Sequence, residues 1–307
     1  MCEIKDVQAI YTFMKLKGIG VNRTNKELLS FAQQLGAMWT LEDWLLSVLS
    51  PEQKEDFFSH YEVVEGLKIR NLQVKFHTVL DETYPLMLRR LLRMNTPPVL
   101  SMIGNTNLLS QKKVGFCGSR YASEKGLAVT LDCVEQLSQM KNLSIVSGYA
   151  QGVDKEAHRT ALQSGGNTII VLPNGISSFY VREELKDVWD WERVLVISEY
   201  LPKDKWTVSR AMNRNKTIIG LCDSIVVVEA GLTGGSMDAG LRALEDSKPL
   251  FVPVFSDYPE SALGNQILLQ KGAQRIGRSR TSHRANVEPM MKFLEEQKVA
   301  VGGSHVS

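Results

Sequence analysis

Small-residue turns that combine glycine with an arginine are the parts of this chain best suited to chemistry. Residues 118–120 (Gly-Ser-Arg) and 147–154 (Ser-Gly-Tyr-Ala-Gln-Gly-Val-Asp) each stand between an apolar run and an amphipathic run. A strand, a glycine turn and a helix in this order point backbone N–H groups and the positive end of a helix dipole at one spot. The forked guanidinium of Arg120 suits phosphate oxygens. The two turns therefore predict a site for a nucleotide or a nucleic-acid backbone.

A third turn has the same form. The apolar run 224–229 leads into residues 231–236, where two adjacent glycines and a serine precede the next amphipathic run. Arg214 and Lys216 lie on a predicted helix just before the apolar run 224–229, where they could reach the site. A solvated helix face would also explain these two cations. Three such turns on one sheet are hard to explain as chance.

Asp154 and His158 stand four residues apart, so a helix would place them on one face. They could form an acid–base pair, but no Ser, Cys or Lys with the signature of a nucleophile accompanies them. We interpret both as structural residues of the loop, with Asp154 hydrogen-bonded at a helix start. The other histidines and the cysteines lack metal-ligand spacing. Since a P-loop and an ordinary nicotinamide motif are also absent from the sequence, we expect no metal, no cofactor and no catalytic residue.

Bulk composition indicates an ordinary globular protein with a sizeable core. The chain has 307 residues, of which 43% are hydrophobic and 23% charged, and its formal net charge of +2 neither requires nor excludes nucleic acid. The four cysteines have no C-x-x-C spacing, which favours a reducing compartment. Without a signal-peptide core or an apolar run of membrane-spanning length, we expect a soluble cytoplasmic protein with no membrane contact.

From Lys113 onward, apolar runs alternate regularly with amphipathic runs. This alternation predicts an α/β, Rossmann-like fold: a mostly parallel sheet with helices on both faces. The expected strands are 114–117, 143–146, 168–172, 194–198, 224–229 and 250–254, and the expected helices are 122–140, 153–163, 181–187, 209–220 and 236–245. Ligands bind such sheets at the carboxyl ends of the strands, where all three turns fall.

The regions on either side of this alternation predict two further domains. Apolar residues at helical spacing predict a small helical N-terminal domain over 1–70. Residues 16–21 resemble the glycine hairpin of helix-hairpin-helix (SAM-like) modules, although a plain helix stop is the simpler interpretation. The Rossmann-like domain is expected over 71–276, with an edge strand in 72–80. A basic tail over 277–307 follows, with a short helix near 287–297 and a loose end from Gly302.

Taken in order, these motifs resemble the DNA-processing protein A family from about residue 72 to residue 276. Residues 118–120 match its G-S-R turn, and 147–158 match its signature S-G-x-A-x-G-[IV]-D-x-x-A-H, the most specific element. Residues 214–216 correspond to its R-N-R helix and 228–236 to its next glycine turn. Its lead-in and closing segments match Asp81 to Pro85, Pro97 to Leu100, Gly104-Asn105, Gly264-Asn265 and Gly272-Ala273.

The resemblance implies a homodimer that binds and protects single-stranded DNA and loads a RecA-type recombinase, as in DNA uptake and transformation. It implies that Arg120, Arg214 and Lys216 contact phosphates while the glycine turns supply backbone donors. Gly148 would let the backbone approach a phosphate, at a position suited to positive φ. The expected DNA-binding residues are Gly118, Ser119, Arg120, Ser147, Gly148, Gln151, Gly152, Arg214, Asn215, Lys216, Gly234, Gly235 and Ser236.

Departures from the family pattern mark a divergent member without a C-terminal winged helix. Gln151 stands where arginine is usual, Lys216 replaces the second arginine of R-N-R, and Val181 follows Tyr180 where proline is typical. Tyr149, Tyr180 and Trp206 fall in or after loops near the expected pocket, where they could stack on bases.

Two other functions stay open. One is a nucleotide-binding sensor module, for example in a defence system. The other is an enzyme related to nucleoside-monophosphate phosphoribohydrolases, whose P-G-G-x-G-T-x-x-E element supplies a glutamate. The third turn has neither threonine nor glutamate at that spacing, which argues against the enzyme.

Overall fold

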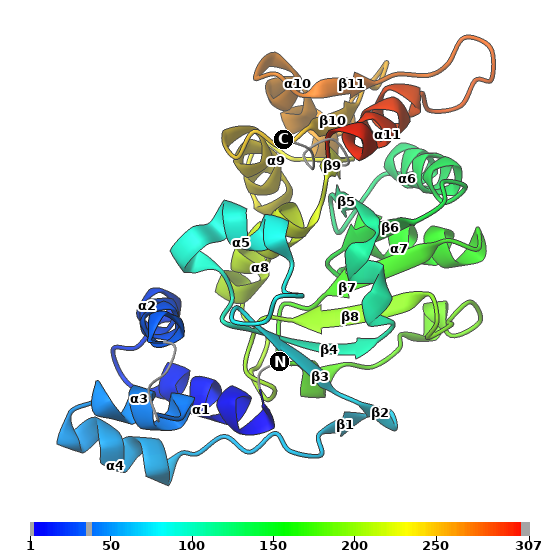
Figure 1. Cartoon of the computed structure of the whole chain (residues 1–307). Coiled ribbons are helices and arrows are strands. Elements are labelled where there is room, and N and C mark those ends of the chain that lie inside the picture. Colours follow the sequence, from blue (N-terminus) through cyan, green and yellow to red (C-terminus); the bar gives the residue numbers. More distant parts are fainter. Residues whose placement is uncertain (1–2, 35–38, 302–307) are drawn as a thin grey trace. The chain divides into compact units, whose positions relative to one another are not determined.

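The computed structural model describes residues 3–34 and 39–301 (Figure 1). Two compact units are present: the first contains Met1–Ile103, Leu172–Tyr180 and Val196–Ala211, and the second contains the remainder of the chain. Cys2 and the tail from Gly302 lie outside the described residues. The domain boundaries expected after residues 70 and 276 stay predictions. Across the described ranges, no helix combines the length and apolarity that crossing a bilayer requires.

The first unit begins with the predicted helices, here α1 (Ile4–Lys15), α2 (Val21–Gln33), α3 (Leu41–Ser47) and α4 (Pro51–Ser59). Capping boxes at Thr40 and Ser50 start α3 and α4, and Pro51 occupies the first turn of α4. Gly18 adopts φ +77° just after α1, and Gly20 is the N-cap of α2. These positions agree with a plain helix stop and restart.

The strands of the first unit are short. β1 (Lys68–Ile69) and β2 (Leu72–Gln73) form an antiparallel pair, and β3 (Lys75–Thr78) pairs antiparallel with β4 (Val99–Gly104). In the sequence, α5 (Leu86–Leu92) and the short 3₁₀ helix η1 (Arg93–Asn95) lie between β3 and β4. The strand expected in 72–80 is therefore broken into β2 and β3.

The second unit contains six parallel strands in the order β11-β10-β9-β5-β6-β7. The central strands are Val- or Ile-rich runs buried on both faces, as a parallel sheet requires, whereas only Ile276 is buried in the edge strand β11. Their bounds are β5 (Lys112–Cys117), β6 (Leu143–Ser147), β7 (Asn167–Val171), β9 (Ser224–Val227), β10 (Leu250–Pro253) and β11 (Gln274–Ile276). The boundary between the units falls within β8 (Val194–Ser198). The predicted α/β, Rossmann-like, mostly parallel fold is confirmed.

Helices cover both faces of this sheet. The helices that share a core on one face are α6 (Glu124–Leu137), α7 (Val153–Gln163) and α11 (Glu288–Val301). On the other face, Gly115 of β5 leaves room for Ile218 of α8 (Val208–Leu221), and Gly240 of α9 (Gly235–Glu245) leaves room for α10 (Leu263–Gln270). The helix expected over 181–187 is wrong: only the 3₁₀ turn Glu183–Leu185 forms, because Leu185 alone of those three residues is buried.

The segment after β11 folds back along α6. Arg284 forms ion pairs with Asp132 and Glu135, and the Ala285 N–H donates to the Asp132 carboxylate. These contacts hold residues 277–287 in place before α11 begins. The basic tail expected here is thus partly a packed element of the second unit.

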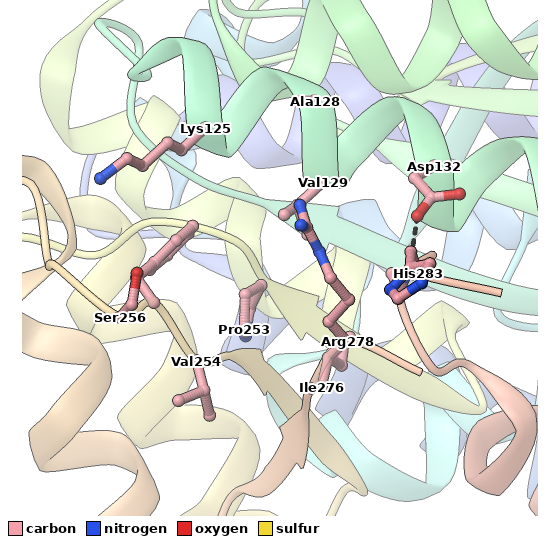
Figure 2. A pocket seen from close by; sticks show the side chains of 13 residues that line it. Lys125, Ala128, Val129, Asp132, Pro253, Val254, Ser256, Ile276, Arg278 and His283 are labelled. Carbon is pink, nitrogen blue, oxygen red and sulfur yellow. Dashed lines mark hydrogen bonds between the residues drawn. The ribbon is translucent and has the colours of Figure 1, made fainter. Parts of the chain in front are cut away.

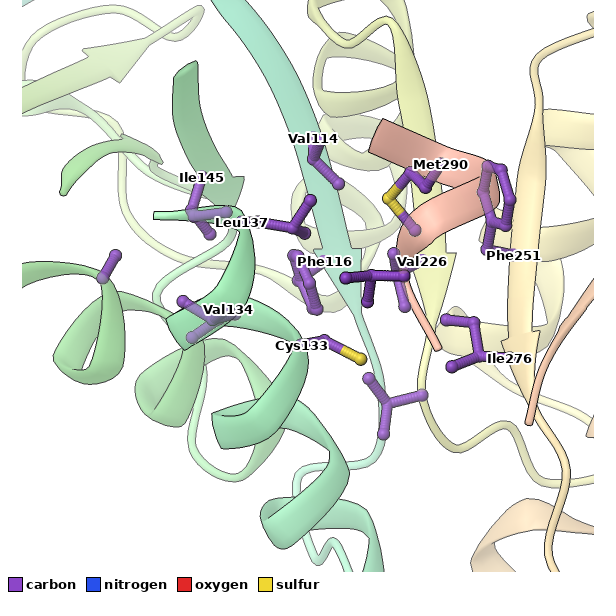
Figure 3. Packing of buried hydrophobic residues seen from close by; sticks show 14 of the residues in the cluster. Val114, Phe116, Cys133, Val134, Leu137, Ile145, Val226, Phe251, Ile276 and Met290 are labelled. Atoms are coloured by element: carbon purple, nitrogen blue, oxygen red, sulfur yellow. The ribbon is translucent and has the colours of Figure 1, made fainter. Parts of the chain in front are cut away.

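The core of the second unit lies between the sheet and these helices. Phe116 of β5, Val226 of β9 and Phe251 of β10 form one buried cluster with Val134 of α6 and Met290 of α11 (Figure 3). Burying side chains of this size contributes about 1.5–3 kcal/mol each. The sheet that carries the three turns is therefore a rigid support.

Candidate functional site

The strand order places the three glycine turns next to one another. β5 pairs with β6 on one side and with β9 on the other, so the first turn lies between the second and the third. Because the strands are parallel, all three turns leave the sheet at its carboxyl edge. This arrangement was expected from the sequence.

The first turn presents exposed side chains on a packed backbone. A Cβ on Gly118 would lie 2.4 Å from the Val153 side chain, so the chain passes close to α7. Ser119 Oγ accepts a hydrogen bond from the Tyr121 N–H at 3.1 Å, which fixes the bend. Beyond that bend Arg120 is exposed, and Tyr121 has 92% of its surface accessible. The turn thus offers a cation and an aromatic ring to the solvent.

Gly152 holds the first turn against the second. Its φ is +72°, and a Cβ there would lie 2.2 Å from the Ser119 carbonyl oxygen. The Val153 N–H donates to that same oxygen at 3.3 Å. Both the conformation and the contact require glycine, so Gly152 acts here in joining the two turns.

Gly148 lies directly on the buried guanidinium of Arg214. A Cβ on Gly148 would be 1.8 Å from Arg214 Nη1, which donates a 2.6 Å hydrogen bond to the Val171 carbonyl oxygen. Arg214 is only 6% exposed. The expectation of positive φ at Gly148 is wrong, since the left-handed residues of this turn are Tyr149 (φ +64°) and Gly152. Glycine is needed at position 148 because of packing.

Tyr149 is enclosed by its neighbours. It is 8% exposed, its hydroxyl accepts from the Arg182 N–H at 3.0 Å, and the Arg182 guanidinium lies 4.5 Å from its ring centroid. Arg182 also donates to the Ala150 carbonyl oxygen at 3.2 Å. With its ring covered in this way, Tyr149 is not a platform for bases, contrary to expectation.

Asp154 uses the backbone donors of the second turn. Its carboxylate accepts from the Ala150 N–H at 3.2 Å. Burial raises the pKa of Asp154, while the Arg214 charge and hydrogen bonds from Ala150, Ser147 and Gly148 act in the opposite direction. These N–H groups are therefore directed at a residue of the protein. Gln151 is the exposed residue of this turn.

His158 is a neutral, buried residue. The Thr168 hydroxyl donates its single proton to the Ile145 carbonyl oxygen at 2.9 Å, so its oxygen accepts from His158 Nδ1–H at 2.7 Å. Burial, together with the charges of Arg182 and Arg214, lowers the pKa of His158 to about 3. Asp154 is thus bonded to the backbone of its own turn and His158 to the Thr168 side chain, which supports the structural interpretation of both residues.

The start of α6 is also occupied. Ser123 caps the helix by accepting from the Gly126 N–H at 3.1 Å, and its own N–H donates to Glu229 at 3.0 Å. Glu229 is fully buried and accepts from Ser261 as well, at 2.8 Å. A carboxylate of the protein already lies where an anion would bind to α6.

The start of α9 is open by comparison. Its N-cap is Gly234, at φ +99°, and no side chain caps the helix. The N–H groups of Gly235 and Ser236 belong to its first turn and have no intrahelical acceptor. Asn215 of α8 holds this turn in place by donating to the Gly235 carbonyl oxygen at 3.2 Å, and the partly buried Lys216 follows it on α8. This third turn has the geometry of an anion site.

Three residues in contact with the turns escaped the sequence analysis: Tyr121, Arg182 and Glu229. Tyr121 directly follows the Gly-Ser-Arg turn, and that position was the signal available for it. The roles of Arg182 and Glu229 depend on contacts far along the chain, which no local pattern reveals. Tyr180 and Trp206 belong to the first unit and are 57% and 48% exposed.

Other chemistry has little support in the part of the chain that is described. There, no group of three or more His, Cys, Asp or Glu side chains could hold a metal ion. Cys117, Cys133 and Cys222 are buried free thiols, and burial raises the pKa of all three above its usual value. Such thiols are poor nucleophiles.

Comparisons with known proteins agree with this arrangement. The family model for DNA recombination-mediator protein A matches residues 75–285. The chain is 30% identical to the DNA processing protein DprA of Streptococcus pneumoniae, over 87% of this chain and 94% of that protein. It is 31% identical to the DprA of Bacillus subtilis, over 64% of this chain and 66% of that protein.

Solved structures give the same result. The X-ray structure of DprA from S. pneumoniae superposes with a TM-score of 0.72 at 28% identity, covering 87% of this chain and 93% of that one. The DprA structure from Helicobacter pylori, described as showing a unique single-stranded DNA binding mode, has a TM-score of 0.58 at 25% identity and covers 74% and 97%. The chain therefore belongs to the DNA recombination-mediator protein A family.

Proposed function

We propose that this protein binds single-stranded DNA through the first and third glycine turns and delivers the bound strand to a RecA-type recombinase, without itself catalysing a reaction. The H. pylori relative, whose structure concerns a single-stranded DNA binding mode, supports the choice of ligand. Action as a homodimer in DNA uptake and transformation is part of the proposal, and it rests on the resemblance to the family.

The open start of α9 is the observation that carries this proposal. Its first N–H groups have no intrahelical acceptor and no cap, so they can bind a phosphate oxygen. The neighbouring first turn adds exposed Arg120, and α8 adds Lys216. Cations that follow the backbone together with exposed aromatic rings are the two parts of a single-strand groove, and Tyr121 supplies a ring.

The second turn has a supporting role in this proposal. Its Ala150 N–H and that of Val153 are already bonded within the protein, and Arg214 is buried beneath Gly148. We therefore propose that Ser147, Gly148, Gly152 and Arg214 position the site, while Arg120, Lys216, Gly235 and Ser236 touch the phosphates.

A negative charge at the start of α9 tests the proposal directly. Ser236→Asp places a carboxylate where the phosphate would lie, yet an acidic residue in the first turn of a helix favours folding. Ser236→Asn is the matched neutral control. In titrations of labelled oligothymidylate, we expect Ser236→Asp to weaken binding about tenfold or more and Ser236→Asn to change it little. Equal affinities for both variants would contradict the proposed site.

Titrations of the unmodified protein separate the competing functions. Salt-dependent binding of single strands in preference to duplex DNA supports the proposal. Tight binding of a mononucleotide with little affinity for oligonucleotides would instead indicate a sensor module. Release of base from a nucleoside monophosphate would indicate an enzyme. Recombinase loading is then measured as RecA filament formation on DNA coated with a single-strand binding protein, with and without this protein.

A further inference from the structure

A cavity of about 670 Å³ lies beneath α6, at the carboxyl ends of β10 and β11 (Figure 2). The function proposed above makes no use of it. One wall is the α6 face that carries Lys125, Ala128 and Val129, and the loop 277–285 forms the opposite wall. All lining residues belong to the second unit.

The lining is apolar at its base and basic at its edges. Pro253, Val254 and Ile276 form an apolar surface, with Phe255 beside them. Such a surface can hold the flat face of a nucleobase, as the ligand pockets of proteins commonly do. The apolar part alone therefore favours a ring-shaped ligand.

The charged lining residues favour an anion. The cations Lys125 and Arg278 line the cavity, and Figure 2 shows the Arg278 side chain extended toward Val129 of α6. Asp132, the one acid in the lining, is already paired with Arg284 outside it. Lys125 pairs with Asp257 at 3.3 Å, but both side chains are more than half exposed, so this pair is weak.

The cavity lies at the same carboxyl edge of the sheet as the three turns. β10 is the neighbour of β9, whose carboxyl end leads into the third turn, and β11 follows β10. At a strand spacing of about 4.8 Å, the cavity begins roughly 5–10 Å from that turn. About one to three nucleotides of a strand span that distance.

We infer that this cavity is a second nucleotide subsite for the same DNA strand. A base lies on the apolar surface formed by Pro253, Val254 and Ile276, and the adjoining phosphate lies between Lys125 and Arg278. The inference rests on the proposed function, because it needs a strand that is already bound at the first and third turns.

The subsite predicts a dependence on oligonucleotide length. Labelled oligothymidylates of about 4 and about 15 nucleotides, the range that single-strand binding folds cover, are titrated against three variants. Arg278→Glu reverses a lining charge, and Ala128→Trp fills the cavity from an exposed position of α6 without changing charge. Arg280→Glu is the matched control, because Arg280 is exposed on the same loop but does not line the cavity.

The expected result is selective. Arg278→Glu and Ala128→Trp weaken the longer oligonucleotide about tenfold and leave the shorter one unchanged, whereas Arg280→Glu affects both lengths little. Equal losses for both lengths, or an equal effect of Arg280→Glu, would overturn the subsite. If the unmodified protein binds neither oligonucleotide, the proposed function itself is wrong; if it binds both and the variants do not discriminate, only the subsite is wrong.

Discussion

The starts of α7 and α9 both follow glycine turns at the ends of buried strands, yet they differ in what their backbone donors contact. At α7, Ala150 bonds to Asp154 and Val153 bonds to the Ser119 carbonyl oxygen. At α9, no side chain caps the helix and the turn is exposed at Leu232. The turn with the more specific sequence signature is thus the locked one. A glycine turn between a strand and a helix can thus be either a support or a binding surface, and the contacts behind the turn decide which.

The largest expected effect tests whether the second turn is locked. Gly148→Ala should lower the free energy of unfolding by about 2–3 kcal/mol, because its Cβ displaces buried Arg214 from Val171. Chemical denaturation measures this. Gly231→Ala in the third turn is the control, since its Cβ meets only the Thr233 carbonyl oxygen at 3.5 Å. Similar costs for the two variants would remove the contrast between the turns.

The pH dependence of stability tests the same region. The folded pKa of His158, about 3, is below its unfolded value of about 6.5, so the unfolded state binds more protons between these values. Stability therefore falls as the pH falls, by about 2 kcal/mol from pH 7 to pH 5 on account of this group.

His158→Gln should remove that part of the slope when denaturation is repeated at both pH values, even if the variant is less stable throughout. The unmodified protein, measured in parallel at both pH values, gives the reference slope. An undiminished slope in His158→Gln would mean that the residue is not buried in its neutral form.

A smaller effect is expected at the first turn, which we propose as part of the DNA-binding surface. Tyr121→Ala should weaken single-strand binding about tenfold, because stacking of one base contributes about 1–3 kcal/mol. Its ring is 92% exposed, so thermal unfolding should not change. Tyr121→Phe retains the ring and should bind normally; if it binds as weakly as the alanine variant, stacking is not the cause.

The smallest effect concerns Arg120. Arg120→Gln should reduce affinity several-fold for all sequences and lower the slope of log K against log salt by about 0.7, the value for one phosphate contact on a single strand. Arg120→Lys keeps the positive charge and should therefore have the same slope as the unmodified protein. A slope that is the same in all three proteins would exclude Arg120 from the phosphate contacts.

Much of the fold could be predicted because its elements follow local rules. The bounds of α7 and β8 agree with the expected 153–163 and 194–198, since continuous buried runs and glycine boundaries mark them. The polar stretch after Ile276 conceals how α11 packs, because few of its residues, including Met290 and Leu294, reach the core. With so few apolar residues at helical spacing, the sequence of this segment shows little periodicity.

The site was harder to predict than the fold. Sequence pattern located the three turns correctly at the carboxyl edge, but the family resemblance implied that Arg214 contacts phosphates, which needs the accessible guanidinium that most arginines have. Its burial under Gly148 depends on β7 and α8 meeting in space. The difference between a locked and an open turn likewise rests on Ser119, Asp154 and Ser123, whose partners no local spacing identifies.

The position of α11 also constrains the order of events during synthesis. Val114 enters the core early, but Met290 and Leu294, which pack against the same cluster, are translated last. At ~5–20 residues per second, the partial sheet waits on the order of 10–40 s for them on the ribosome. The apolar surface over β9 and β10 is complete only at Pro253 and then stays uncovered for on the order of 2–8 s until Leu294 is made. A nascent chain stalled before residue 288 should therefore be the form most dependent on chaperones.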